Sequence, residues 1–171
     1  MISGKMQKAL NHQINQEFQS AFTYLALSAY FESEELRGCA YWMRIQYEEE
    51  LMHAAKIYDY IHDRDGEVSL STVPAPECDP GSPLAAFELA LDGEQALTGQ
   101  IYDLVDLSHD ERDHGTHTFL QWFVTEQVEE EDVIRDIVKD LKRIGDSNDG
   151  LFMLDRELKQ RQPQSTASPA E

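Results

Sequence analysis

The stretch Y-E-E-E-L-M-H, residues 47–53, places Glu50 and His53 three positions apart inside a segment with the apolar period of a buried helix. Residues at i and i+3 share one face of a helix, so a carboxylate and an imidazole at this spacing can bind one metal ion together. An isolated E-x-x-H is weak support for a metal site, because the same spacing arises by chance in many exposed helices.

A second stretch, T-E-Q-V-E-E-E at residues 125–131, repeats the arrangement 77 positions later with Gln127 and Glu130. A single glutamate, Glu17 in the first half and Glu94 in the second, precedes each pair by 33 positions. Two helical hairpins that each supply one glutamate and one ligand pair can build a two-metal site inside a four-helix bundle. We therefore predict an all-α protein organised around such a site.

The composition narrows the class of protein. At 171 residues the chain has the length of one domain with a full core. Aspartate and glutamate outnumber lysine and arginine by 33 to 14, and the resulting net charge of −19 argues against nucleic acid as a direct partner. This acidity suits cationic ligands, and it also suits simple solubility.

Targeting signals and a disulfide framework are not expected. No apolar run reaches the about 20 residues of a membrane-spanning helix, and the first residues lack the apolar core of a signal peptide. The two cysteines lie in dissimilar contexts and form neither a metal pair nor a disulfide framework. We expect a cytoplasmic protein that contacts no membrane.

Apolar residues recur at helical spacing in four long segments. The first is expected to begin at a cap on Ser3 and to reach about Phe31. An interruption is expected at residues 37–38, followed by a second helix over about residues 39–65 that Gly66 would end.

The second half follows the same plan after a long connection. Residues 66–81 carry three prolines and no helical period, so we expect a crossover that runs the length of a helix and makes the second and third helices parallel. The third helix is expected to begin at Ser82, which precedes a proline. The fourth should follow a break at residues 113–115 and end at Gly145.

A short fifth helix is expected over residues 150–160, capped by Asp146 or Ser147. A closed four-helix bundle does not need its apolar surface, so we expect a neighbouring subunit to bury it. The chain thus divides into a bundle over 1–145, a fifth helix within 146–160 and a disordered tail over 161–171. The apolar residues of the fifth helix are Leu151, Phe152, Leu154 and Leu158.

Glutamates in the middle of apolar stripes need partners, because a lone buried carboxylate is costly. Several carboxylates in a low dielectric repel one another, so we expect bound divalent cations, and an oxygen-rich set with one nitrogen suits iron or manganese. Six groups are predicted to meet at the middle of the bundle: Glu17, Glu50, His53, Glu94, Gln127 and Glu130.

Within that set, Glu50 is the candidate bridge between two ions. Glu17 and His53 would complete the ligands of the first ion, and Glu94 and Glu130 those of the second. The remaining group, the neutral amide of Gln127, is a poorer ligand than a carboxylate. We therefore expect the second ion to be held more weakly and released more easily.

With these features the chain resembles a bacterial non-haem ferritin over about residues 3–159, most specifically in F-L-Q-W-F-V-T-E-Q-V-E-E-E, residues 119–131. The resemblance implies the ferritin-like bundle with its long crossover and short fifth helix, whose Glu and E-x-x-H pattern characterises di-iron proteins of this kind. It further implies a ferroxidase centre that oxidises Fe2+ with O2 or peroxide, and a homo-oligomeric hollow shell of 24 subunits that stores Fe3+ as a hydrated oxide mineral.

The resemblance also assigns residues outside the six groups. Glu49, Glu126 and Glu129, with Glu130 shared, match the residues that bind a third iron in bacterial members. Tyr24 matches the tyrosine next to the family's metal centre, a candidate electron donor. A hydrogen-bonded core tyrosine is the alternative interpretation.

Two departures from related proteins matter. Bacterioferritins complete a second E-x-x-H and place a haem-ligating methionine directly after the first motif's glutamate. Here the second motif is incomplete, Leu51 occupies the methionine position and Met52 lies one residue away, so haem is not expected.

The second departure concerns iron entry. Animal ferritins line their three-fold channels with acidic residues near the start of the fourth helix, where this chain has His117 and Leu120. We interpret the polar residues nearby as a solvated turn. They are Asp110, Glu111, Asp113 and His114.

Two alternative functions remain open from the sequence. One is a di-iron oxidase or peroxidase that stores no mineral, and the other is a metal-free helical scaffold. The repeated ligand spacing disfavours the scaffold. The surplus apolar surface of the fifth helix favours a shell over an oxidase that works alone.

Overall fold

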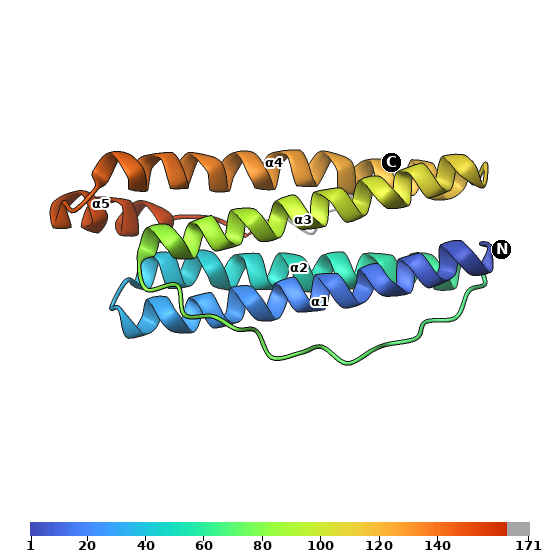
Figure 1. The fold of residues 1–171 in the computed structure, drawn as a ribbon, viewed down its shortest axis with the longest axis horizontal. Helices are drawn as coiled ribbons and strands as arrows, with labels where there is room; N and C mark the ends of the chain where they lie inside the picture. Colours follow the sequence, from blue (N-terminus) through green and yellow to red (C-terminus); the bar gives the residue numbers. More distant parts are fainter. Residues whose placement is uncertain (164–171) are drawn as a thin grey trace.

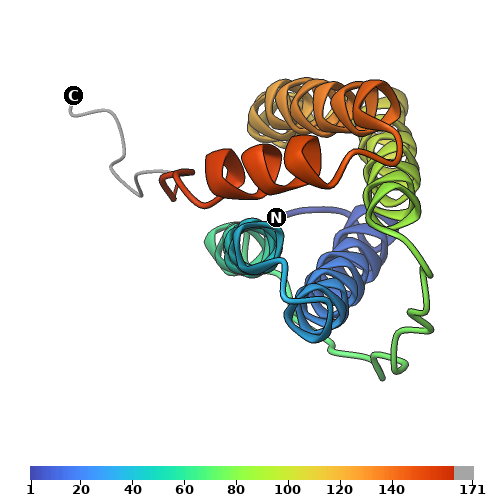
Figure 2. The ribbon, with the colours of Figure 1, turned by 90° about the vertical axis from the view of Figure 1, so that its left-hand side faces the viewer.

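The computed structural model describes residues 1–163, which form five helices and no strand. Four long helices lie side by side as two antiparallel hairpins, α1 with α2 and α3 with α4, and the short α5 packs against α2 and α4 (Figures 1 and 2). This arrangement confirms the predicted all-α bundle. The helices are α1 (Gly4–Ser33), α2 (Arg37–Asp63), α3 (Pro83–Asp110), α4 (His114–Ile144) and α5 (Asn148–Leu158).

Serine side chains begin three of the helices. The hydroxyl oxygens of Ser3, Ser82 and Ser147 each accept a hydrogen bond from a backbone N–H three residues later, at 3.0, 3.1 and 3.2 Å. Such caps satisfy donors that have no partner within the first turn. The predicted starts of α1 and α3 are confirmed, and Ser147 caps α5.

The break between α1 and α2 lies one to three residues earlier than predicted. The interruption expected at residues 37–38 belongs to α2, and the chain turns instead at Glu35, whose φ is 61°. Gly38 has a different purpose, because a Cβ there would lie 1.6 Å from the carbonyl oxygen of Asp155 in α5. The glycine permits a close approach between helices rather than ending one.

The end of α2 also differs from the prediction. Asp65, with φ of 55°, takes the left-handed conformation that we expected of Gly66. The backbone N–H of Gly66 donates to the carbonyl of Ile61 at 2.8 Å, which satisfies one of the last helical acceptors. A Cβ on Gly66 would lie 2.9 Å from the Ile61 side chain, so this glycine too is required by packing.

The connection between α2 and α3 runs along the whole bundle, so that α2 and α3 are parallel, as predicted (Figure 1). Side chains of α1 hold the connection in place through hydrogen bonds to its backbone. Asn11 donates to the carbonyl of Glu67 at 2.9 Å and accepts from the N–H of Ser69 at 2.6 Å. Gln7 accepts from the N–H of Glu67 at 3.0 Å. These contacts replace the secondary structure that the connection lacks.

The short helix α5 is fixed to the start of α2 by Asp155. One carboxylate oxygen of Asp155 accepts hydrogen bonds from the backbone N–H groups of residues 38 and 39, at 2.8 and 2.9 Å. The dipole of α2 also favours a negative charge at this end of the helix. Leu154 and Leu158 are buried in the core of the same subunit, so part of the apolar surface that we assigned to a neighbour is already covered. Phe152 and Met153 stay 61% and 71% exposed.

The core consists of two apolar clusters at either end of the bundle. One includes Phe31, Trp42 and Phe87, and the other includes Leu10 and Phe123. The six groups predicted to bind the two metal ions are buried and polar and belong to neither cluster, because they occupy the middle of the same helical stripes, whereas Tyr24 packs in the first cluster. No helix in residues 1–163 is both long and apolar enough to cross a membrane.

Candidate metal centre

Four helices each contribute to one buried polar layer. The site residues come from α1, from the middle of α2, from α3 and from α4, and none is more than 6% exposed. The structure therefore buries all six groups that the sequence predicts. They are Glu17, Glu50, His53, Glu94, Gln127 and Glu130.

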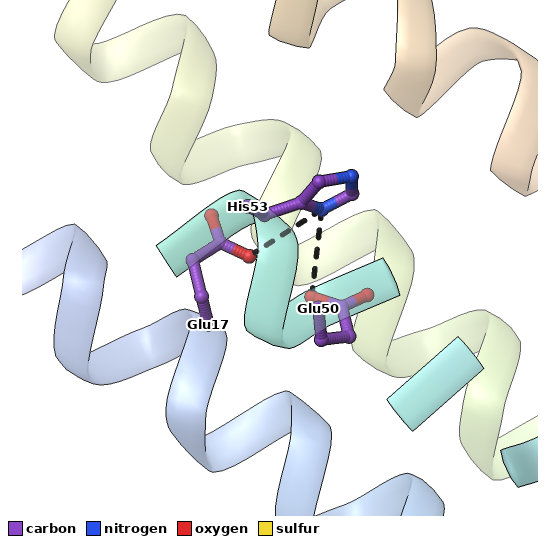
Figure 3. Close-up of side chains that lie close together, drawn as sticks. All are labelled: Glu17, Glu50 and His53. Carbon is purple, nitrogen blue, oxygen red and sulfur yellow. Dashed lines mark ion pairs between the residues drawn. The ribbon is translucent and has the colours of Figure 1, made fainter. Parts of the chain in front are cut away.

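The first half of the site joins α1 to α2. Glu17 and Glu50 both point at the imidazole of His53 (Figure 3), with their Oε2 atoms 4.0 and 3.7 Å from its Nδ1. Ligands about 2.1 Å from one metal ion lie about 3 to 4 Å apart. One ligand atom from each of the three lies within 4.8 Å of the others, so these side chains could hold a single ion.

The second half brings three carboxylates together. Ligand atoms of Glu50, Glu94 and Glu130 lie within 4.8 Å of one another. Glu50 belongs to both groups, so it could bridge two ions held by them. His53 also links the two halves of the site, because its Nε2 lies 3.8 Å from Oε1 of Glu130.

Burial raises the pKa values of Glu50, Glu94 and Glu130 and so favours their protonated forms when no metal is bound. Burial raises the pKa of Glu50 well above its ordinary value, and the charges of Glu94, Glu17 and Glu130 raise it further. The pKa values of Glu130 and Glu94 are also raised, in both cases chiefly by burial. A divalent cation would offset the cost of ionising these groups.

Several polar atoms of the site have no hydrogen-bond partner within residues 1–163. Both carboxylate oxygens of Glu50 and of Glu130, and both ring nitrogens of His53, are buried without a hydrogen bond. Buried polar groups are normally hydrogen-bonded, so six such atoms around one point need an explanation. Bound cations would supply it, since carboxylate oxygens and imidazole nitrogens are metal ligands.

Glu94 is positioned from two sides. The hydroxyl of Tyr24 donates a hydrogen bond to Oε1 of Glu94, and the Gln127 amide donates to Oε2 at 3.2 Å. Burial, followed by the charges of Glu94 and Glu50, raises the pKa of Tyr24 well above 10, so the hydroxyl keeps its proton. The amide nitrogen of Gln127 thus supports a ligand from the neighbouring helix.

The sequence pattern did not predict two residues that hydrogen-bond to the site. Gln13 donates to Oε1 of Glu17 at 2.9 Å. Thr98 accepts from the Gln127 amide at 3.3 Å and donates to Glu131 at 2.7 Å. Each lies four positions from a predicted glutamate on the same helix, so the i,i+4 rule could have identified both.

The residues assigned to a third iron lie on one side of this layer. Glu49 is 5% exposed, Glu126 is half-buried and Glu129 is exposed on α4. The charges of Glu49 and Glu126 help to raise the pKa of Glu130 after burial and nearer carboxylates, which places both close to the di-metal site. Among the described residues, none of these three joins the two ligand groups above.

The polar turn before α4 has a structural role. Asp113 accepts from the N–H of Thr116 and from Arg64, both at 3.1 Å, and so caps α4 and ties it to the end of α2. Burial alone would raise the pKa of Asp113, but the hydrogen bonds from Thr116 and Arg64 lower it below its ordinary value. Asp113 is thus a structural cap whose side chain is only 14% exposed, rather than part of a solvated turn.

Residues 7–144 match the family of ferritin-like domains. The chain belongs to the ferritin family. The bacterial non-heme ferritin of Staphylococcus saprophyticus is 38% identical over 161 residues, covering 94% of this chain and 96% of that protein. The bacterial non-heme ferritin of Staphylococcus aureus strain USA300 is 38% identical over 158 residues, covering 92% and 95%.

Solved ferritin structures agree with this fold over nearly its whole length. A novel open-pore ferritin from the hyperthermophilic archaeon Archaeoglobus fulgidus superposes with a TM-score of 0.94 at 48% identity, covering 95% of this chain and 100% of that one. A form of the same archaeal ferritin engineered to be closed gives a TM-score of 0.93, also at 48% identity, covering 95% and 99%. The four-helix bundle predicted from residue spacing and the resemblance to ferritins are therefore both confirmed.

Proposed function

We propose that this ferritin stores iron and that its buried layer is a ferroxidase centre. Two Fe2+ ions per subunit bind there as substrate and are oxidised by O2 or peroxide, and the Fe3+ product is stored as a hydrated oxide mineral inside a hollow shell. The observation that carries the proposal is the pair of ligand groups that share Glu50, each within 4.8 Å.

Each side chain of the centre has a proposed ligand role. Glu17 and His53 hold the first ion, Glu94 and Glu130 hold the second, and Glu50 lies between them. Because burial raises the pKa of Glu50 and so favours its protonated form in the metal-free site, binding of two cations displaces that proton and leaves the negative charge that stabilises Fe3+.

Release of the product is favoured on the second side. A fourth ligand there would be the neutral Gln127, whose amide nitrogen instead donates to Glu94. We propose that the second Fe3+ leaves first for this reason. Tyr24, hydrogen-bonded to the same glutamate, is the proposed electron donor, and Glu49, Glu126 and Glu129 are proposed to bind a third iron with Glu130.

The shell is proposed to contain 24 subunits, with a mass of about 470 kDa from chains of 19.6 kDa. Exposed apolar side chains on α5, Phe152 and Met153, support burial against other subunits. The structural relatives of this chain are ferritins, described as open-pore or engineered closed forms.

Light scattering of the purified protein, combined with Fe2+ oxidation in air, tests the proposal. We expect a particle of about 470 kDa, rapid oxidation of two Fe2+ per subunit, and an electron-dense core after repeated additions. A monomer, or an absence of rapid oxidation, would contradict it. A di-iron oxidase or peroxidase without storage would oxidise Fe2+ but leave the iron outside the particle.

A further inference from the structure

Arg161 lies beyond the last turn of α5 and reaches back to α2. Its Nη2 donates to Oε2 of Glu49 at 2.6 Å, and its guanidinium carbon lies 4.5 Å from the ring centroid of Trp42. The side chains of Arg161 and Glu49 are 20% and 6% exposed. We had assigned this position to a disordered tail, but a charge-assisted hydrogen bond and a cation–π contact hold it in the protein.

The ion pair lies beside the metal site, because Glu49 directly precedes Glu50 in α2 and its charge acts on Glu130. The guanidinium is therefore a positive charge that the chain itself brings to the outer edge of the carboxylate layer. Nη1 of Arg161 is buried without a hydrogen-bond partner in residues 1–163, so only one of the two terminal nitrogens of the guanidinium is bonded to the carboxylate. Arg161 therefore lacks the bidentate contact to Glu49 that holds an arginine most firmly to a carboxylate.

We propose that Arg161 is a resident cation that competes with the third iron ion for Glu49. This inference rests on the proposed function, since it presumes that iron binds beside the ferroxidase pair. An ion cannot bind the same carboxylate oxygen while the guanidinium remains, because two positive charges would lie within a few ångströms of each other. The segment after α5 therefore sets the affinity of the outer position relative to the inner pair.

Competition has a direct consequence for the order of filling. The inner carboxylates form no ion pair with a lysine or arginine within the described residues, whereas the outer position must first release Arg161 from Glu49 and Trp42. Iron consequently fills the ferroxidase pair before the third position. Binding of the third ion frees the segment that follows α5.

Anaerobic titration with Fe2+, followed by calorimetry and equilibrium dialysis, tests the inference without any oxidation step. We compare the wild type with Arg161→Ala and Arg161→Lys. The matched control is Arg156→Ala, because Arg156 is an exposed α5 arginine over the ring of Phe152. Circular dichroism and light scattering verify that each variant folds and assembles.

We expect the first two equivalents of Fe2+ to bind equally in all four proteins. The third equivalent should bind about tenfold more tightly in Arg161→Ala, with a smaller gain in Arg161→Lys because lysine keeps the charge but loses the planar contact. The control should match the wild type. Adding Glu49→Gln to Arg161→Ala should abolish the gain.

Emission from Trp42 gives an independent readout in a Trp122→Phe background. The third equivalent should change that emission in the wild type, and in Arg161→Ala the change should already be present without iron. Unaltered affinity for the third ion in Arg161→Ala, with two tight equivalents retained, would refute the inference and leave the ferroxidase proposal intact. Failure of the wild type to bind the first two would refute the ferroxidase proposal instead.

Discussion

The hydroxyl of Tyr24 donates a hydrogen bond to Glu94, which joins α1 to α3 before any metal ion binds. Both side chains are at most 2% exposed, and burial keeps the phenol protonated. The tyrosine therefore positions a proposed ligand of the second ion. It is also the proposed electron donor, and its hydroxyl contacts that ligand directly.

Replacing Tyr24 with phenylalanine should destabilise the metal-free protein. The change removes a hydrogen bond to a buried carboxyl group and should lower the thermal midpoint by about 3 to 6 °C, corresponding to about 1 to 2 kcal/mol. Differential scanning calorimetry provides the measurement. Tyr58→Phe is the control, because Tyr58 is 43% exposed and should tolerate the change. Equal midpoints for Tyr24→Phe and the control would refute this role.

Glu50→Gln should change how the stability of the metal-free protein depends on pH. The pKa of Glu50 is raised in the folded state, so between the unfolded value of about 4.5 and the folded value the unfolded chain releases a proton that the folded one keeps. Stability is therefore lost as the pH rises through this window, by up to about 1.4 kcal/mol per pH unit for one group.

The glutamine variant should accordingly become more stable than the wild type as the pH increases from 5 to 7. Chemical denaturation at several pH values measures the difference. Glu129→Gln, on the exposed face of α4, should follow the wild-type profile. Parallel profiles for Glu50→Gln and wild type would show that Glu50 ionises normally.

Glu50→Ala and Glu129→Ala should separate the inner site from the outer one. Loss of the shared ligand should slow the first oxidation of two Fe2+ per subunit by at least about tenfold. Glu129→Ala should leave that first phase within about twofold and alter later additions. Stopped-flow absorbance resolves the phases, and an equal loss in both variants would mean that the inner and outer positions are misassigned.

Gln127→Glu should hold the second Fe3+ longer. A carboxylate binds Fe3+ better than an amide, so the initial burst should change little and repeated additions should slow by about threefold or more. Gln121→Glu, an exposed change on the same helix, serves as the control. Recovery of the burst at the wild-type rate after each addition would contradict the release argument.

The helical stripes and the site glutamates could be predicted from sequence because burial and periodicity act locally. A lone glutamate such as Glu17 or Glu94 within an apolar stripe is costly, and the repeated spacing shows where its partners lie. The positions of Gly38 and Gly66 could not be interpreted in this way. Their purpose depends on atoms of other segments that approach the backbone closely, and a sequence pattern carries no such distances.

The contact between Arg161 and Glu49 is the clearest case of information absent from the sequence. These residues lie 112 positions apart, and nothing in the terminal segment indicates a partner. Their contact depends on the direction of α5, which Asp155 fixes at the start of α2. Composition indicated a disordered tail over 161–171, and only the three-dimensional path of the chain places the guanidinium of Arg161 beside the candidate metal site.

The central claim is that two metal ions share Glu50. Crystals soaked briefly in Fe2+ without oxygen, with diffraction recorded on both sides of the iron absorption edge, test it most directly. The predicted result is one anomalous peak among Glu17, Glu50 and His53 and a second among Glu50, Glu94 and Glu130, with the first filled at shorter soaking times. Iron at the second position with the first empty would overturn the ligand assignment, and no iron in contact with Glu50 would contradict the account as a whole.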